Sequence, residues 1–422
     1  MVKVVIIGGA WSGCAAALTA VKAGAKVDLI ERTDMLLGSG LVGGIFRNNG
    51  RFTAAEEMIA LGGGEFFKIM DSLKTHEKIE FPGHKHSSLY DAAKIEPEVQ
   101  RLLQKKGVKV KLQTRITDLD KTKDTITSVR SEEKETFVGD VFIDCTGTAA
   151  NTVNCVKYGN GCAMCIYRCP TFKTRVSISE KAGIKDIIAM RPDGTPGVFS
   201  GSCKLMKHTL SPGIIKELNE TGVSIIPIPT KLIDEDKLSK KACIQYALLE
   251  YAQNIILLDT GFAKLMTPFF ELEKLRQIPG LENARYEDPY SGGVGNSIRY
   301  MAMAPRDNAL RVKGIKNLFC AGEKSGLTVG HTEVIVTGSL AGYNSVKQCN
   351  GDEVLILPEK LAVGDIISYS NDQMKKEEGL KKRYTFSGGP YFERMKKLGL
   401  YTTNVKEIVD RVEKVGLKEV FA

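Results

Sequence analysis

The feature that most constrains the fold lies at the start of the chain, in residues 2–31. A short apolar run from Val2 to Ile7 precedes a glycine turn and an alanine-rich stretch, and a second apolar run, Lys26 to Ile30, ends at Glu31. Apolar runs bounded by glycine are typical of strands buried in a parallel sheet. The order strand, glycine turn, helix, strand predicts a βαβ unit of the Rossmann type.

This glycine turn predicts a dinucleotide site. Glycine lets the backbone turn tightly and approach a pyrophosphate, and the following helix offers unpaired N–H groups and the positive end of its dipole. Glu31 closes the second strand, where its carboxylate can accept a hydrogen bond from a ribose hydroxyl. Ala10 occupies the usual middle glycine of the pattern, and we expect alanine to be tolerated there because it is small.

A second glycine turn, far downstream, favours FAD over a nicotinamide cofactor. The segment IKNLFCAGEKSGLTVGHTEVIVTGSLAG (315–342) contains an apolar strand, the pair Gly322–Glu323 and a small-residue helix that begins near His331. A nicotinamide enzyme needs one contiguous unit of this kind, whereas the ribityl chain and ring of FAD extend beyond it. We expect the helix near His331 to direct its N-terminus at the flavin ring.

Three further stretches complete the predicted cofactor site. GSGLVGGIFRN (38–48) is rich in glycine, VKVKLQTRITDLD (108–120) alternates as strands do, and FVGDVFIDCTGTAAN (137–151) ends a strand in a Thr-Gly turn. The predicted cofactor-binding residues are Gly8, Gly9, Ala10, Gly13, Glu31, Arg32, Ser39, Gly43, Ile116, Thr146, Gly147, Gly322, Glu323, Gly330, His331 and Thr332.

The N-terminal fingerprint, PGLENA (279–284) and the 315–342 segment together resemble the GidA-like FAD-dependent oxidoreductases. That group includes tRNA-modifying flavoproteins, among them the folate/FAD-dependent tRNA methyltransferase. The resemblance covers about the first 150 residues and roughly residues 275–348. It implies a bound FAD and leaves the substrate open.

We therefore predict an α/β protein with a Rossmann-type FAD-binding fold of the two-dinucleotide-binding-domain kind. The expected parts are residues 1–150 and 279–350 for FAD, an inserted α+β capping or substrate domain at 151–278, and a helical C-terminal element at 351–422. Within the insert, VSIIPIPT (223–230) predicts a strand, and KKACIQYALLEYAQNII (240–256) has helical periodicity.

A cysteine cluster in the insert leaves three alternatives open. Cys162, Cys165 and Cys169 with Pro170 match the end of a bacterial ferredoxin run, and Cys155 is the candidate fourth ligand of a [4Fe-4S] cluster, with Cys145 or Cys203 as substitutes. The cluster could instead supply a flavin-coupled dithiol or a nucleophile, or simply be packing residues. The candidate catalytic residues are Cys162, Cys165 and His331, while His84 and His86 are expected on an exposed loop.

Composition narrows the class of protein further. No apolar run has the roughly 18 residues that span a bilayer, and no signal peptide precedes the first strand, so a cytoplasmic protein without membrane contact is expected. The net charge of +9 is compatible with an anionic cofactor or RNA and diagnostic of neither. The chain shows no clear basic stripe and no recognisable RNA-binding signature.

These features predict an FAD-dependent oxidoreductase that passes electrons or hydride through flavin. NAD(P)H or another reductant is the candidate electron donor. A small molecule or an electron-transfer partner is the candidate electron acceptor. A homo-oligomer is also compatible with the sequence. The first alternative is a folate/FAD-dependent RNA (uracil-5) methyltransferase that would use a cysteine nucleophile. The second is a flavin-fold protein that acts as a binding or assembly module.

Overall fold

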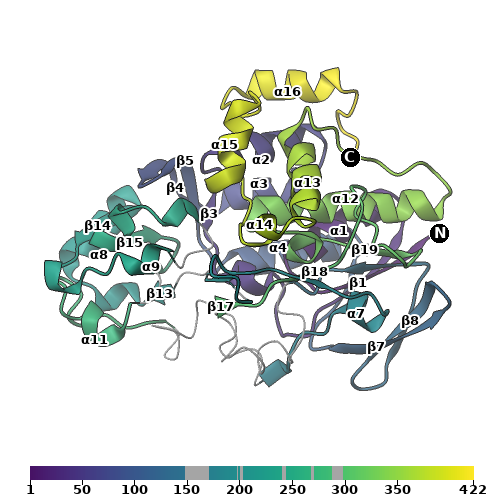
Figure 1. The fold of residues 1–422 in the computed structure, drawn as a ribbon, viewed down its shortest axis with the longest axis horizontal. Coiled ribbons are helices and arrows are strands. Elements are labelled where there is room, and N and C mark those ends of the chain that lie inside the picture. Colours follow the sequence, from purple (N-terminus) through teal and green to yellow (C-terminus); the bar gives the residue numbers. More distant parts are fainter. Residues whose placement is uncertain (148–170, 197, 200–202, 240–243, 268–269, 288–297) are drawn as a thin grey trace.

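A five-stranded parallel sheet, in the order β19-β10-β1-β2-β6, lies at the centre of the fold (Figure 1). The computed structural model describes residues 1–147, 171–196, 198–199, 203–239, 244–267, 270–287 and 298–422. In sheet order, the strands are Leu318–Cys320, Val141–Asp144, Lys3–Ile7, Lys26–Ile30 and Lys109–Lys111. The predicted βαβ unit is confirmed, because β1 and β2 pair in parallel and α1 (Trp11–Lys22) connects them.

Both faces of this sheet are covered, which explains why its strands are nearly continuous apolar runs. Val4 and Ile6 of β1 pack in one cluster with α1 and α12 (His331–Cys349). Val5 and Ile7 point the other way and pack on the antiparallel sheet β7-β8-β9. The strands of that sheet are Ile116–Thr122, Thr125–Ser131 and Thr136–Val138.

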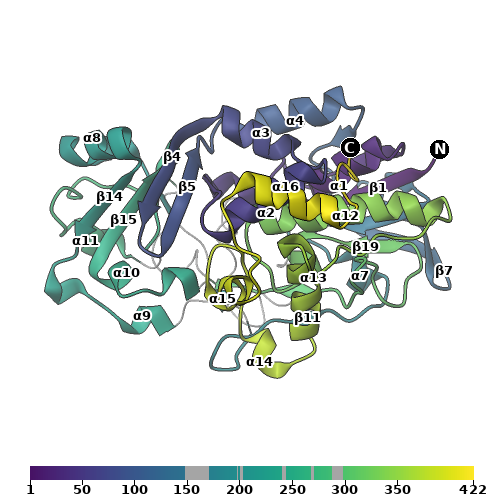
Figure 2. The same cartoon turned by 90° about the horizontal axis from the view of Figure 1, so that it is seen from above.

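The helices α1 and α12 lie side by side on one face of the sheet, and their backbones meet at glycine residues (Figure 2). A Cβ atom on Gly338 would lie 2.2 Å from the carbonyl oxygen of Ser12. A Cβ atom on Gly342 would lie 2.2 Å from the carbonyl oxygen of Ala16. Since real Cβ atoms do not approach an oxygen so closely, glycine at these two positions sets the distance between the helices.

The inserted region contains a separate four-stranded antiparallel sheet, β13-β16-β15-β14, with its own hydrophobic cluster (Figure 1). In that order, the strands are Cys203–Leu205, Ala263–Leu265, Asn254–Asp259 and Val223–Pro227. The strand predicted at 223–230 is confirmed over residues 223–227 by β14. The helical prediction for 240–256 is wrong over the part that enters β15. The five residues after Asn254 in NIILLD are all buried, and the periodicity of such a run does not distinguish a strand from a helix.

A three-stranded antiparallel sheet, β3-β5-β4, connects the two halves of the molecule through a shared hydrophobic cluster. Its strands are Ile45–Phe46, His84–Tyr90 and Lys74–Phe81. The expectation of an exposed histidine loop is wrong here, since His84 and His86 belong to β5 and only 2% of His84 is exposed. The imidazole of His84 stacks on the ring of Phe81 with 4.6 Å between centroids, which accounts for its burial.

Four helices lie at the end of the chain, so the predicted helical C-terminal element is confirmed; α13 and α16 pack against α2 (Gly50–Ala60), and α13 also contacts α12. These helices, α13 to α16, are Ala362–Gln373, Glu377–Leu380, Gly389–Lys397 and Val405–Lys414. Among the described residues, the other α-helices are α3 (Glu65–Ser72), α4 (Ile95–Lys105), α7 (Ile178–Lys181), α8 (Pro212–Thr221), α9 (Asp236–Ser239), α10 (Glu250–Gln253) and α11 (Leu272–Leu275). Short strand pairs join β11 (Ile187–Ile188) to β18 (Ala302–Met303) and β12 (Val198–Phe199) to β17 (Ile298–Arg299).

The division of the chain into FAD-binding, inserted and C-terminal parts, with boundaries at residues 150, 278 and 350, stays a prediction.

Among the helices that the structure describes, none combines the length and the apolar character needed to cross a bilayer.

Gly338→Ala tests the contact between α1 and α12. The added methyl group would overlap the Ser12 carbonyl, so the free energy of unfolding should fall by about 1–3 kcal/mol, as for other overpacked cores. Gly213→Ala in α8 is the matched control, because nothing lies within 4 Å of a Cβ atom there and alanine favours a helix. Equilibrium unfolding in urea measures both changes; equal effects would contradict the claimed contact.

Candidate functional site

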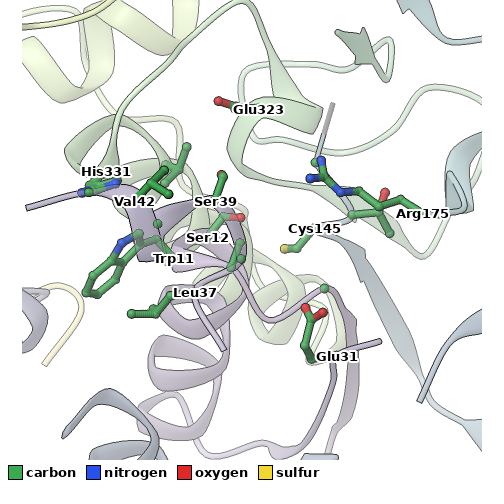
Figure 3. Close-up of a pocket in the computed structure, with 18 of the residues that line it drawn as sticks. Trp11, Ser12, Glu31, Leu37, Ser39, Val42, Cys145, Arg175, Glu323 and His331 are labelled. Atoms are coloured by element: carbon green, nitrogen blue, oxygen red, sulfur yellow. The ribbon is translucent and has the colours of Figure 1, made fainter. Parts of the chain in front are cut away.

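A pocket of about 280 Å³ lies where the carboxyl ends of β1, β2 and β10 meet the N-termini of α1 and α12. Trp11 and His331 lie at one end of this pocket and Glu31 at the other (Figure 3). The inner end, near His331, is completed by Lys264 and Met266 from the four-stranded sheet of the insert. Ligands of open α/β sheets bind at this edge, outside the carboxyl ends of the strands.

Gly8 forms the turn between β1 and α1. Its φ of +104° lies in a region that favours glycine, and a Cβ atom would lie 2.3 Å from the carbonyl oxygen of Cys145. Ala10, in contrast, has φ −68° and ψ 179°, an extended conformation that any residue adopts. Alanine at the middle position of the fingerprint therefore introduces no backbone strain.

The N-terminus of α1 points into the pocket without a side-chain cap. Ala10 is its N-cap residue and provides no side-chain hydrogen bond, and Ser12 in the first turn lines the pocket. The first N–H groups of a helix have no partner within the helix, and the dipole adds positive charge at this end. Such an end binds phosphate or another anion.

The carboxylate of Glu31 connects the glycine turn to the end of β2. Its Oε2 accepts the N–H of Gly9 at 2.8 Å, and its Oε1 accepts the N–H and the hydroxyl of Thr33, both at 2.9 Å. Only 7% of Glu31 is exposed, although the residue lines the pocket. The glycine turn and the acidic residue therefore form one hydrogen-bonded unit.

The second helix terminus at the pocket is that of α12. Gly330, its N-cap residue, has φ +132° and offers no side-chain cap. A Cβ atom on Gly330 would lie 2.0 Å from Nη2 of Arg51, so glycine is required there. Arg51 is paired with Glu333 in the first turn of α12, with 3.1 Å between Nε and Oε1, and Thr385 donates its hydroxyl to Oε1 of the same carboxylate at 2.6 Å.

His331, the first residue of α12, stays neutral at ordinary pH. Burial, with the charges of Arg51 and Lys264 as smaller causes, lowers the pKa of His331 to about 3. Nδ1 of His331 lies 3.2 Å from the hydroxyl of Tyr90, and its ring centroid lies 5.8 Å from that of Trp11. The imidazole can donate or accept one hydrogen bond here, but it supplies no positive charge.

Most of the predicted cofactor-binding residues line the pocket, namely Gly8, Ala10, Glu31, Arg32, Ser39, Gly43, Ile116, Thr146, Gly147, Glu323, Gly330 and His331. Four others have different positions: Gly9 donates to Glu31, Gly13 packs against the Gly8 carbonyl, Gly322 donates its N–H to a threonine of α12, and Thr332 is buried in the first turn of α12. That any of these residues binds a cofactor stays a prediction.

Sequence reasoning missed many of the residues that line the pocket, among them Trp11, Arg51 and Lys264. Trp11 stands at a variable position of the glycine fingerprint, so the motif gives it no weight. Lys264 could have been recognised from the sequence, because it is the one charged residue within the apolar run FAKLM. No local sequence pattern identifies Arg51, since its ion-pair partner Glu333 is far away in the sequence.

The predicted cluster of Cys155, Cys162, Cys165 and Cys169 lies outside the described residues. Within the described ranges, no group of three or more His, Cys, Asp or Glu side chains is arranged to hold a metal ion. Cys145 lines the pocket, and burial, followed by the charge of Asp144, raises the pKa of its thiol well above the usual value. Cys145 is therefore protonated and a poor nucleophile.

Two segments of the chain match known families. Residues 3–152 match the family "FAD dependent oxidoreductase", and residues 252–353 match the family "Glucose inhibited division protein A". The chain is 35% identical over 96 residues to the methylenetetrahydrofolate--tRNA-(uracil-5-)-methyltransferase TrmFO of Streptococcus sanguinis, which is 22% of this chain and 20% of that protein. It is 35% identical over 102 residues to the tRNA uridine 5-carboxymethylaminomethyl modification enzyme MnmG of Nitratiruptor sp., 23% of this chain and 15% of that protein.

A solved structure of Aquifex aeolicus GidA is similar over the whole fold. Its TM-score is 0.66 at 16% identity, and the similarity covers 98% of this chain and 76% of the GidA chain. The similarity of structure shows the fold, while the sequence matches cover less than a quarter of the length of either curated relative. On these matches, the chain is similar to the FAD-dependent oxidoreductase and GidA families over two separate segments, and to TrmFO and MnmG over less than a quarter of its length.

Proposed function

We propose that the chain binds FAD in this pocket and uses it to exchange electrons or hydride with a small-molecule substrate or an electron-transfer partner. One observation carries the proposal: a single elongated pocket receives two uncapped helix N-termini and, at its far end, a buried carboxylate. A dinucleotide with an anionic pyrophosphate and a ribose matches this arrangement of charge. The match of residues 3–152 to the FAD-dependent oxidoreductase family supports a flavin as this dinucleotide.

Residues at both ends of the pocket fit FAD. The Glu31 carboxylate has about four lone-pair sites, and three hydrogen bonds from Gly9 and Thr33 leave one for a ribose hydroxyl. The indole Nε1–H of Trp11 is buried at the pocket wall and has no acceptor among the described residues. A buried donor without a partner is costly, so an acceptor on the ligand would satisfy it.

When bound, FAD supplies the hydride and electron chemistry. The chain's own residues bind and orient it: the first turn of α1 holds the phosphates, and the N-terminus of α12 directs its positive dipole end at the inner part of the pocket. His331 holds Tyr90 through Nδ1 and, being neutral, does not repel the cationic groups nearby.

The electron donor and the role of the cysteines belong to this proposal as well. NAD(P)H or another reductant would deliver electrons, and a [4Fe-4S] cluster at Cys155, Cys162, Cys165 and Cys169 would relay them if it assembles. Cys145 cannot serve as the redox thiolate at neutral pH, because burial keeps its thiol protonated.

A folate/FAD-dependent RNA (uracil-5) methyltransferase is the second candidate, because the name of one relative, TrmFO of Streptococcus sanguinis, describes that activity. Such a transferase would need a nucleophilic cysteine. Burial raises the thiol pKa of Cys14 and Cys145, and it raises that of Cys320 to about 12. The sequence-predicted candidates Cys162 and Cys165 of the insert would then be the nucleophiles to test; methyl transfer to a tRNA transcript, lost in Cys162→Ser, would favour this candidate.

Purification of the chain under anaerobic conditions tests the proposed function. We expect flavin absorption bands, one FAD per chain after extraction, and loss of the flavin colour when NADH or NADPH is added. An assay of iron and sulfide on the same sample, repeated with Cys162→Ser, decides whether the cysteines hold a cluster. A colourless chain that takes up no added FAD would contradict the proposal.

Glu31→Gln should weaken FAD binding about tenfold or more. The substitution removes the negative charge and one acceptor oxygen, and hydrogen bonds to a charged group contribute about 1.5–3 kcal/mol. Calorimetric titration of the FAD-free chain measures the dissociation constant. Glu98→Gln in α4 is the matched control, because Glu98 is half-buried and forms an ion pair with Arg101; a Glu31→Gln chain that keeps the parent affinity would exclude a contact between Glu31 and the ligand.

A further inference from the structure

Lys264 joins the insert to the glycine-rich loop of the cofactor site. It lies in the middle of β16, only 6% of it is exposed, and it lines the inner end of the pocket. Its ammonium group donates to the carbonyl oxygen of Val42 and, at 2.7 Å, to that of Gly43. A side chain from the antiparallel sheet therefore holds the loop that follows β2.

One hydrogen-bond donor of Lys264 remains available. A lysine ammonium has three N–H groups, and the two carbonyl oxygens of the loop accept two of them. In the part of the chain that the structure describes, Lys264 has no third acceptor and no carboxylate within ion-pair distance. The third N–H is a buried donor on the wall of a ligand pocket.

The charge of Lys264 is uncompensated by the residues around it. Burial, with the positive charges of Lys204 and Arg51 as smaller causes, lowers the pKa of Lys264 to about 7, and only the weakly acidic thiol of Cys203 acts in the opposite direction. The other group that faces it, His331, is neutral. A buried cation in such surroundings either loses its proton or binds an anion.

The neighbouring cation cannot take this role. Arg51 forms a buried ion pair with Glu333 from α12, with Nε 3.1 and 3.2 Å from the two carboxylate oxygens. Its charge is therefore already balanced within the protein. Lys264 is the group at the inner end whose protonation can respond to a ligand.

We propose that Lys264 forms an anion subsite at the inner end of the pocket, where its third N–H binds an anionic oxygen of the ligand. This inference rests on the proposed function. The oxygen belongs either to the reduced flavin ring or to a carboxylate or enolate of the substrate, since both present the same chemistry to an ammonium group. Binding makes and breaks no covalent bond of the ligand. Where Lys264 is neutral beforehand, its amine takes up one proton from solvent.

The subsite has a defined pH dependence. Below pH 7 Lys264 is already protonated, so anion affinity stays constant. Above pH 7 each bound anion must first recruit a proton, so affinity falls as pH rises, by up to tenfold per pH unit. Lys264→Gln keeps donors for the Val42 and Gly43 carbonyls but has no charge, so it should remove this dependence.

Two measurements on the FAD-loaded chain distinguish the sources of the anion. The first is the midpoint potential of FAD without substrate, read from absorbance against a reference dye. If the reduced ring is the anion, Lys264→Gln should bind reduced FAD in preference to oxidised FAD about tenfold less strongly than the parent chain does. Its midpoint potential should then be about 30 mV lower, for a two-electron couple. The second is titration of the oxidised chain with benzoate, followed by the change in flavin absorbance; if a substrate carboxylate is the anion, Lys264→Gln binds benzoate at least tenfold more weakly.

Lys274→Gln is the matched control for both measurements, because Lys274 is an exposed lysine in α11 of the same insert. Lys264→Arg keeps the charge and should retain most of the parent behaviour. Benzamide, which is neutral, should show no difference between Lys264→Gln and the parent chain. If Lys264→Gln binds FAD normally and changes neither the potential nor benzoate affinity, the subsite is overturned and the proposed function survives; if the parent chain binds no FAD, both fail.

Discussion

The contact between the backbones of α1 and α12 is the constraint on which the rest of the structure depends. At Gly338 and Gly342, hydrogen atoms face the carbonyl oxygens of Ser12 and Ala16 where a Cβ atom would be only 2.2 Å away. Two helices from opposite ends of the chain therefore lie against each other on one face of the sheet. Their N-termini open into the same pocket, so the close packing determines where two partial positive charges meet.

Charge is arranged along the pocket in a way that suits a long ligand. Glu31 provides negative charge at one end, the uncapped turn of α1 provides N–H groups in the middle, and Lys264 provides a buried cation at the other end. The Arg51–Glu333 ion pair is internally balanced and holds the start of α12 in place. The insert contributes directly to the site through Lys264, so it forms part of the pocket wall.

Local patterns predicted the parts of the site that local geometry decides. Residue order alone predicts the turn at Gly8, the strand that ends at Glu31 and the helix that begins at His331. The conformation of a glycine turn, of an apolar strand and of a helix start depends mainly on residues a few positions apart. Tertiary contacts decided the rest. His84 was expected in a loop but pairs in β5, and the apolar run Asn254–Asp259 became a strand because β14 and β16 flank it.

The most direct test uses Trp11, the one tryptophan in the chain, which lines the pocket beside His331. Titration of the FAD-free protein with FAD should quench the tryptophan fluorescence and saturate at one FAD per chain, because a flavin in this pocket lies close to the indole. Unchanged tryptophan fluorescence would contradict the claim that α1 and α12 together form the flavin site, even if flavin still bound elsewhere.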